Sequence, residues 1–177
     1  LGILRSRPLI AVARWMERLA YKSSTRIVAL SPGMKAGITA VGVPPERISV
    51  IPNASDLDRF GTELSSCNTW LLEHPELMGR SLVVYCGTLN RLNGVAYLTE
   101  VAAYALEKDP GLAFLVVGSG RERDDIENKA KSIGVLGRNF FMYPPVPKQQ
   151  VPLILDAATV VTSLFLPLKP MEVNSAN

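Results

Sequence analysis

The feature that most constrains the fold is a series of short, unbroken apolar runs separated by helix-like segments. The first two runs occupy residues 82–86 and 113–117. Runs this short, without polar residues at alternate positions, are typical of parallel strands covered on both faces. Between them, apolar residues recur on one face of a helix. The alternation predicts right-handed strand–helix–strand crossovers and a doubly wound, parallel α/β sheet.

The same alternation extends in both directions along the chain. Towards the end, the sequence predicts a charged helix after residue 120, a strand at 139–143, a short helix at 149–157 and a strand at 159–162. Near the start, it predicts a helix at 8–22, strands at 26–30 and 48–51, and a helix between these strands. Ser31 is the expected N-cap of that helix, because Pro32 follows at its first position.

Residues 55–80 interrupt the alternation and divide the chain into 1–54, a connection and 81–177. The stretch is rich in turn-forming residues and contains the only histidine, His74. A connection of this length is expected to hold a helical turn of its own. His74 lies among Glu73, Pro75 and Glu76, which favours a solvated surface position over a catalytic one.

Basic residues are concentrated in the first third of the chain. Residues 1–60 hold nine Lys and Arg against four Asp and Glu, whereas the whole chain has a net charge of +3. Five of them lie on or beside the helix predicted at 8–22: Arg5, Arg7, Arg14, Arg18 and Lys22. With its apolar residues, this helix is suited to an anionic membrane surface. The simpler alternative is a surface helix that packs on its own domain.

The composition excludes several other classes of protein. Of the 177 residues, 47% are hydrophobic and 20% are charged, which excludes a disordered chain. No apolar stretch approaches the roughly 20 residues that span a bilayer. Cys67 and Cys86 fit no metal or redox spacing, so a reducing cytoplasm is the simpler location. We expect no nucleic-acid partner, because no basic stripe is interleaved with aromatic residues.

Three loops follow strands of the predicted sheet, at residues 87–94, 118–120 and 143–148. In a doubly wound sheet, the carboxyl ends of the strands form the ligand crevice, so these loops are expected to meet at one pocket. Their glycines let the backbone approach a ligand, and the helices that follow favour an anion such as phosphate. A nucleotide is therefore the predicted ligand. Tight turns without any ligand explain the glycines equally well.

The turn at 118–120 matches only part of a dinucleotide fingerprint. It contains two of the three glycines, and Arg123 occupies the place of the third. No acidic residue follows at the position where a ribose-binding carboxylate belongs. These departures argue against NAD.

The order of several segments resembles glycosyltransferase family 4. The end of the first domain of these enzymes resembles residues 27–34, 42–53 and 56–60 of this chain. The first three strand-and-loop units of their second domain resemble residues 85–94, 115–120 and 139–143. Residues 171–177 resemble the start of the segment that grips the donor sugar. The resemblance implies the GT-B architecture, with 1–54 as the end of the N-terminal acceptor domain and 81–177 as an incomplete donor domain.

The resemblance implies a retaining transferase that moves a sugar from a nucleotide diphosphate sugar to a glycan or lipid-linked acceptor. Such an enzyme would build a polysaccharide or glycolipid in the cytoplasm, at the inner face of the plasma membrane. The donor is a substrate, and neither a metal nor a cofactor is implied. We expect this chain to be an internal piece of a longer enzyme and inactive alone, and its motifs name no catalytic residue.

The resemblance also implies donor-binding positions. Thr88 and Asn93 stand where the family commonly has an Arg and a Lys directed at the pyrophosphate, and Arg91 is expected to supply the positive charge that the leaving group needs. Backbone groups around Pro145 and Val146 are expected to face the base. The full predicted set is Gly87, Thr88, Arg91, Asn93, Gly94, Gly118, Gly120, Pro145, Val146 and Glu172.

Other activities fit the same sheet and loops. A nucleotide-sugar epimerase of GT-B architecture would isomerise the donor sugar instead of transferring it. A NAD-dependent oxidoreductase would bind its dinucleotide at residues 118–120. A binding domain without turnover is the third alternative.

Overall fold

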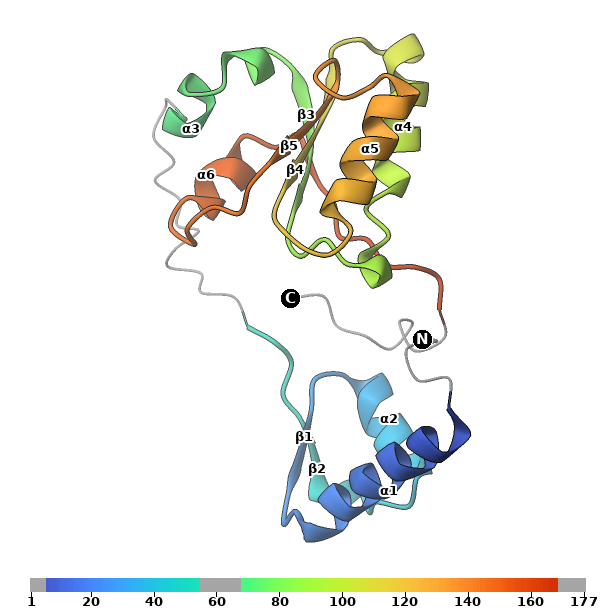
Figure 1. Cartoon of the computed structure of the whole chain (residues 1–177). Helices are drawn as coiled ribbons and strands as arrows, with labels where there is room; N and C mark the ends of the chain where they lie inside the picture. Colours follow the sequence, from blue (N-terminus) through green and yellow to red (C-terminus); the bar gives the residue numbers. More distant parts are fainter. Residues whose placement is uncertain (1–5, 55–67, 169–177) are drawn as a thin grey trace. The chain divides into compact units, whose positions relative to one another are not determined.

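The computed structural model describes residues 6–54 and 68–168 (Figure 1). These residues form two compact units: residues 6–54 together with 167–168 belong to the first, and residues 68–166 belong to the second. Each unit has its own parallel sheet.

The first unit is a small α/β arrangement. Its elements are α1 (Arg7–Ser23), β1 (Ile27–Ala29), α2 (Pro32–Ala40), the 3-10 helix η1 (Pro45–Arg47) and β2 (Ile48–Val50). Strands β1 and β2 pair in parallel, with Ile27 opposite Ile48. The expected N-cap of α2 is confirmed, because the Ser31 hydroxyl accepts a hydrogen bond from the Met34 amide at 3.1 Å.

The second unit contains the longer sheet. Its helices are α3 (Thr69–Leu72), α4 (Tyr97–Lys108), α5 (Arg123–Ile133), α6 (Val151–Asp156) and the 3-10 helices η3 (Pro75–Leu77) and η4 (Arg91–Asn93). Its strands are β3 (Ser81–Cys86), β4 (Leu112–Val117), β5 (Phe140–Tyr143) and β6 (Val160–Val161), arranged in the order β5-β4-β3-β6. All three pairings in this sheet are parallel.

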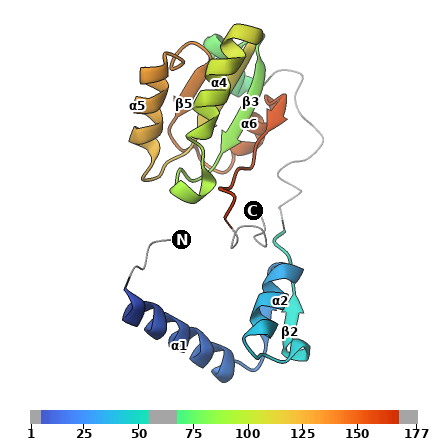
Figure 2. The ribbon, with the colours of Figure 1, turned by 90° about the vertical axis from the view of Figure 1, so that its right-hand side faces the viewer.

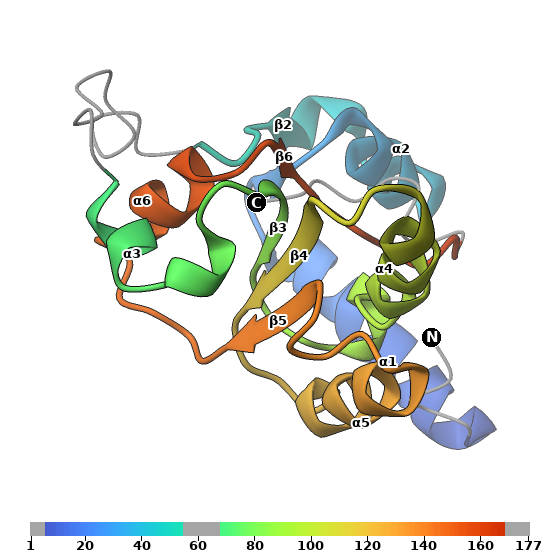
Figure 3. The ribbon, with the colours of Figure 1, turned by 90° about the horizontal axis from the view of Figure 1, so that it is seen from above.

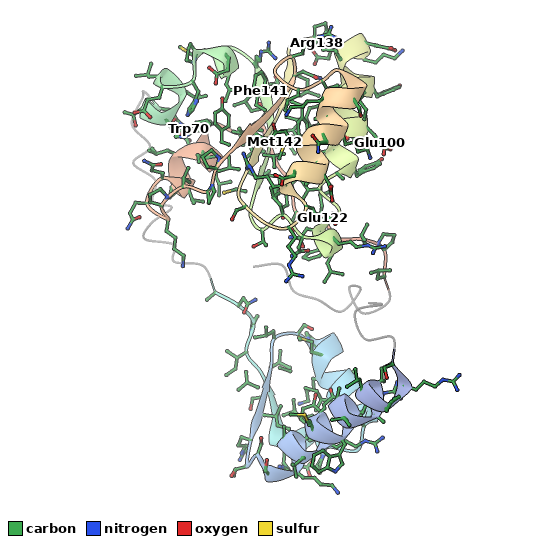
Figure 4. The ribbon with its side chains drawn as sticks, in the orientation of Figure 1. Trp70, Glu100, Glu122, Arg138, Phe141 and Met142 are labelled. Carbon is green, nitrogen blue, oxygen red and sulfur yellow. The ribbon has the colours of Figure 1, made fainter. Side chains whose placement is uncertain are left out.

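Helices cover both faces of this sheet, as Figure 3 shows from above. On one face, α4 and α5 pack on side chains that include Phe114 and Phe140. On the other face, α3 and α6 pack on side chains that include Leu82 and Leu115. Phe141 and Met142, neighbours in β5, belong to opposite faces (Figure 4). The predicted doubly wound parallel sheet is confirmed.

Residues 68–80, which the sequence analysis places in the connection, pack on the sheet of the second unit. Trp70 is 6% exposed and Leu77 is 1% exposed, and both lie in the core that contains Leu82 and Leu115 (Figure 4). The apolar face of β3 and β4 needs a cover, and α3 and η3 provide part of it. The remaining residues of the predicted connection, 55–67, lie outside the described residues.

Helix α1 does not bury its apolar residues in its own unit. Five of them are exposed by half or more of their surface: Leu9, Val12, Trp15, Met16 and Leu19. Tyr21 packs against the small core of Ala29, Val43 and Ile48, and at 100° per residue the apolar stripe lies on the other side of the helix. Figure 2 shows the amino-terminal half of α1 extending away from α2 and β2. No helix among the described residues is long and apolar enough to cross a membrane.

Candidate functional site

The strand order fixes where a ligand crevice forms in the second unit. The chain runs from β3 to β4 to β5 in one direction, and β6 then returns to the other side of β3. In open parallel sheets, ligands bind at the carboxyl ends of the strands near such a reversal. The loop after β3 and the segment after β6 meet at this edge of the sheet, because the Leu166 amide donates a hydrogen bond to the Leu92 carbonyl at 2.8 Å.

A pocket of about 220 Å³ lies at the carboxyl ends of β3, β4 and β5. Its lining comes from all three loops and α6: Cys86, Gly87, Thr88, Val117, Gly118, Ser119, Pro145, Val146 and Val151. We call it the loop pocket. The structure thus brings together five residues of the predicted set, Gly87, Thr88, Gly118, Pro145 and Val146. The lining contains no charged side chain, so backbone groups and the Thr88 and Ser119 hydroxyls supply its polar surface.

Gly118 and Gly120 are required by contacts between two loops. A Cβ at Gly118 would lie 1.9 Å from the Gly87 carbonyl oxygen, and one at Gly120 would lie 2.0 Å from that of Leu89. Such separations are far inside van der Waals contact, so only glycine fits. The two loops are also hydrogen-bonded, since the Leu89 amide donates to the Ser119 carbonyl at 2.8 Å. The absence of side chains at Gly118 and Gly120 therefore lets the two loops pack closely against each other.

Asn93 is engaged inside its own loop. Its side-chain Nδ2 donates to the Thr88 carbonyl at 2.6 Å and to the Tyr85 hydroxyl at 2.8 Å. The Tyr85 hydroxyl in turn donates to the Thr88 carbonyl at 2.8 Å, and burial raises the pKa of Tyr85. Both hydrogen bonds from Asn93 hold the loop, and its place in the donor-binding set stays a prediction.

The remaining predicted residues of this loop lie outside the pocket lining. Arg91 is exposed on η4. Gly94 adopts a left-handed conformation with φ of 59° and ends η4. The Asn90 side chain caps η4 within the loop, because it accepts the amide hydrogens of Leu92 and Asn93. Helix α4, which follows the loop, has no side-chain N-cap hydrogen bond. The Asn90 cap was absent from the sequence prediction.

Cys86, Ser119 and Val151 are pocket residues that the sequence analysis does not select. Cys86 ends β3 and is half-buried, and burial raises the pKa of its thiol. A signal for Cys86 was available, because it directly precedes a loop glycine at a strand end. Val151 comes from α6, and only the packing of that helix against the loops places it there.

His74 occupies a packed position rather than an open surface. Its ring centroid lies 4.1 Å from that of Trp70 and 4.5 Å from that of Tyr143. Its Nδ1 lies 3.4 Å from Glu76 Oε1, and the Tyr143 hydroxyl donates to the same oxygen. The hydrogen bond from Tyr143 lowers the pKa of Glu76, whereas burial and Glu76 raise the pKa of Tyr143. The His74 side chain is therefore 20% exposed and more closely packed than expected, because α3 and η3 fold onto the end of β5.

The predicted donor-binding residue Glu172 lies outside the described residues. Among residues 6–54 and 68–168, no group of His, Cys, Asp and Glu side chains has the arrangement of a metal site.

Comparison with known proteins finds similarity to glycosyltransferases. Residues 2–54 match the glycosyl transferase 4-like domain. The chain is 28% identical over 173 residues to the UDP-Gal:alpha-D-GlcNAc-diphosphoundecaprenol alpha-1,3-galactosyltransferase of Escherichia coli, covering 93% of this chain and 44% of that enzyme. It is 27% identical over 166 residues to the alpha-maltose-1-phosphate synthase of Mycolicibacterium smegmatis, covering 89% and 42%. The chain thus spans less than half the length of these relatives.

Solved structures show the same fold. The chain superposes on Anabaena Alr3699/HepE in complex with UDP and glucose with a TM-score of 0.73 and 18% identity, covering 86% of this chain and 41% of that one. For WaaG, a glycosyltransferase involved in lipopolysaccharide biosynthesis, the TM-score is 0.66 at 19% identity, with coverage of 85% and 43%. In its parallel sheets and its amino-terminal segment, this chain resembles the group 1 glycosyltransferases, and its fold is that of part of a GT-B enzyme.

Proposed function

We propose that this chain provides the donor-binding pocket of a glycosyltransferase that uses a nucleotide diphosphate sugar. The observation that carries the proposal is the loop pocket, whose walls come from the loops after β3, β4 and β5. Ligands of doubly wound sheets bind at this edge. Similarity to glycosyltransferases supports sugar transfer over the epimerase and oxidoreductase alternatives.

Two relatives support a uridine nucleotide as the donor's carrier. The E. coli enzyme is named as using UDP-Gal, and the Anabaena structure contains UDP and glucose. The uncharged lining of the loop pocket suits a planar, neutral base. Arg91 lies on the loop that contributes Gly87 and Thr88 to the pocket, and we assign it to the diphosphate. We further propose retention at the anomeric carbon, without a metal or a separate cofactor.

The acceptor is proposed to be a glycan or a lipid-linked sugar. The E. coli relative is named for a diphosphoundecaprenol-linked acceptor. Because this chain spans less than half of that enzyme, we expect it to bind donor and to lack transferase turnover when isolated. The glycosyl transferase 4-like domain is matched at residues 2–54.

Binding of UDP to the full chain tests the donor proposal. Cys86 lines the loop pocket, so bound UDP should slow alkylation of its thiol. The chain has two cysteines, so the assay uses the Cys67→Ser variant, in which Cys86 is the remaining thiol. A pH near 8.5 keeps the reaction measurable, because burial raises the pKa of Cys86 and lowers its thiolate fraction at neutral pH. We expect saturable protection by UDP, matching heat in calorimetry, and no protection by NAD.

Two results would contradict the donor proposal. Binding of NAD with no response to UDP would favour the oxidoreductase. Unchanged alkylation of Cys86 at saturating UDP, when calorimetry records binding, would place the nucleotide elsewhere.

We propose that α1 contacts the anionic inner face of the plasma membrane. Its exposed stripe contains Trp15 at 63% and Met16 at 59% exposure. Arg14 and Arg18 lie on the side of the helix away from this stripe, which gives the helix an apolar face and a basic face. Opposite charge attracts the basic face to acidic lipid headgroups.

Vesicle binding tests the contact of α1 with membranes. We expect the chain to sediment with phosphatidylglycerol-containing vesicles and not with neutral phosphatidylcholine vesicles, and Trp15 emission to shift to shorter wavelength. Leu19→Glu should abolish both effects. Leu72→Glu is the matched control, because Leu72 is exposed in the second unit, and it should leave both effects unchanged. If the chain instead forms dimers that Leu19→Glu dissociates, and ignores both vesicles, the stripe is a protein contact.

A further inference from the structure

Arg123 lies where the ends of two neighbouring strands meet the loop pocket. It is the first residue of α5 and is half-buried. A single nitrogen, Nη1, donates to the Gly118 carbonyl at 2.9 Å and to the Tyr143 carbonyl at 3.0 Å. These carbonyls belong to the chain just after β4 and to the last residue of β5. The guanidinium therefore bridges the ends of β4 and β5.

The bridged carbonyls lie at the base of two opposing pocket walls. Gly118 lines the loop pocket directly. Tyr143 precedes the segment that carries Pro145 and Val146 on the other wall. Pro144 and Pro145 have no amide hydrogen with which to hold this segment to the sheet. Arg123 and the Gly118 amide, which donates to the Tyr143 carbonyl at 3.2 Å, anchor the point where the second wall leaves β5.

The location of Arg123 is unfavourable for a cation by local criteria. The first turn of a helix carries partial positive charge and favours acidic residues, and Asp124 and Asp125 follow that rule in α5. The two carbonyl acceptors offset this cost for Arg123. A residue that breaks a local rule and is compensated by contacts at a site is a candidate for a role in that site.

We propose that Arg123 is a positioning residue that sets the separation of the Gly118 wall from the Pro145–Val146 wall. The guanidinium is absent from the pocket lining, so it acts through the two carbonyls and not by touching the ligand. The expected consequence, tighter binding of the nucleotide, rests on the proposed donor site. The spacing of the two walls does not depend on that proposal and is measured without a ligand.

The test compares three variants of the full chain in the Cys67→Ser background. Arg123→Met removes the donors and keeps much of the length of the side chain. Arg123→Lys keeps a cation with enough N–H donors for both carbonyls. Arg121→Met is the matched control, because Arg121 is exposed in the preceding turn and does not line the pocket. The measurements are the alkylation rate of Cys86, UDP affinity by calorimetry, and the circular dichroism spectrum.

Arg123→Met is expected to raise the alkylation rate of Cys86 at least about threefold and to weaken UDP binding about tenfold, because the walls are no longer pre-organised. Arg123→Lys should stay within about threefold of the parent in alkylation rate and in UDP affinity. Arg121→Met should give the same two values as the parent. A folded Arg123→Met with the parent's alkylation rate overturns the proposal.

The remaining outcomes are equally decisive. If Arg123→Met does not fold, Arg123→Lys decides: a folded Lys variant with strongly weakened UDP binding and an unchanged alkylation rate shows a direct ligand contact and overturns the positioning role. If the parent chain does not bind UDP at all, the donor proposal fails, and the Cys86 rates still decide the role of Arg123.

Discussion

Replacing Gly118 by alanine is expected to lower the free energy of unfolding of the second unit by about 2 to 4 kcal/mol and to abolish measurable UDP binding. The new Cβ would lie 1.9 Å from the Gly87 carbonyl oxygen. This oxygen belongs to the backbone and cannot rotate away, so the steric clash is removed only if one loop moves away from the other. Gly87 and Gly118 both line the loop pocket, and the movement would therefore change its shape.

Gly37→Ala is the matched control for this substitution. Gly37 lies inside α2, and nothing is within 4 Å of the position its Cβ would take. Alanine there should stabilise the helix by up to about 1 kcal/mol. Hydrogen exchange at the buried Leu115 and Val116 amides of β4 reports on the second unit alone. Similar exchange in the parent and Gly118→Ala would show that the two loops can separate at no cost.

Replacing Trp70 by alanine is expected to destabilise the second unit by about 3 to 5 kcal/mol, because it removes a large side chain from a packed core. Trp70 is 6% exposed and packs with Leu77 on the α6 side of the sheet. Its ring also contacts His74 and Tyr143. The same exchange measurement at Leu115, combined with chemical denaturation, gives the change in free energy.

Trp15→Ala is a control with the same chemical change. Trp15 is 63% exposed, so its removal should alter stability by no more than about 0.5 kcal/mol. An equally small effect for Trp70→Ala would mean that residues 68–80 behave as a free connection. A large effect would establish that this segment is part of the second unit's core.

The secondary structure of this chain was predictable to a large degree because it follows from local spacing. The apolar runs at β3 and β4 have the continuous pattern of covered parallel strands. Ser31 followed by Pro32 marks the start of α2 through groups within one helical turn. The location of the pocket also followed, since strand–helix alternation places successive loops at one edge of the sheet.

The roles of individual loop residues were less predictable. Asn93 stands where the resemblance implies a Lys, and its hydrogen bonds to Thr88 and Tyr85 depend on how the loop closes. Gly118 resembled a ligand-facing glycine, and its real constraint is a carbonyl 31 positions earlier in the chain. Arg123 stood out only as a missing glycine, although it bridges two strand ends.

The sequence by itself therefore determined the alternation of strands and helices, the parallel sheet and the edge at which its loops gather. These properties depend on side-chain periodicity and on capping groups that lie within a few residues of one another. Only the tertiary structure decided that Trp70 belongs to the core, that Gly118 faces a backbone and that Arg123 joins β4 to β5. Each of these contacts joins groups on different segments, and its energy depends on distances of a few ångström that local spacing does not encode.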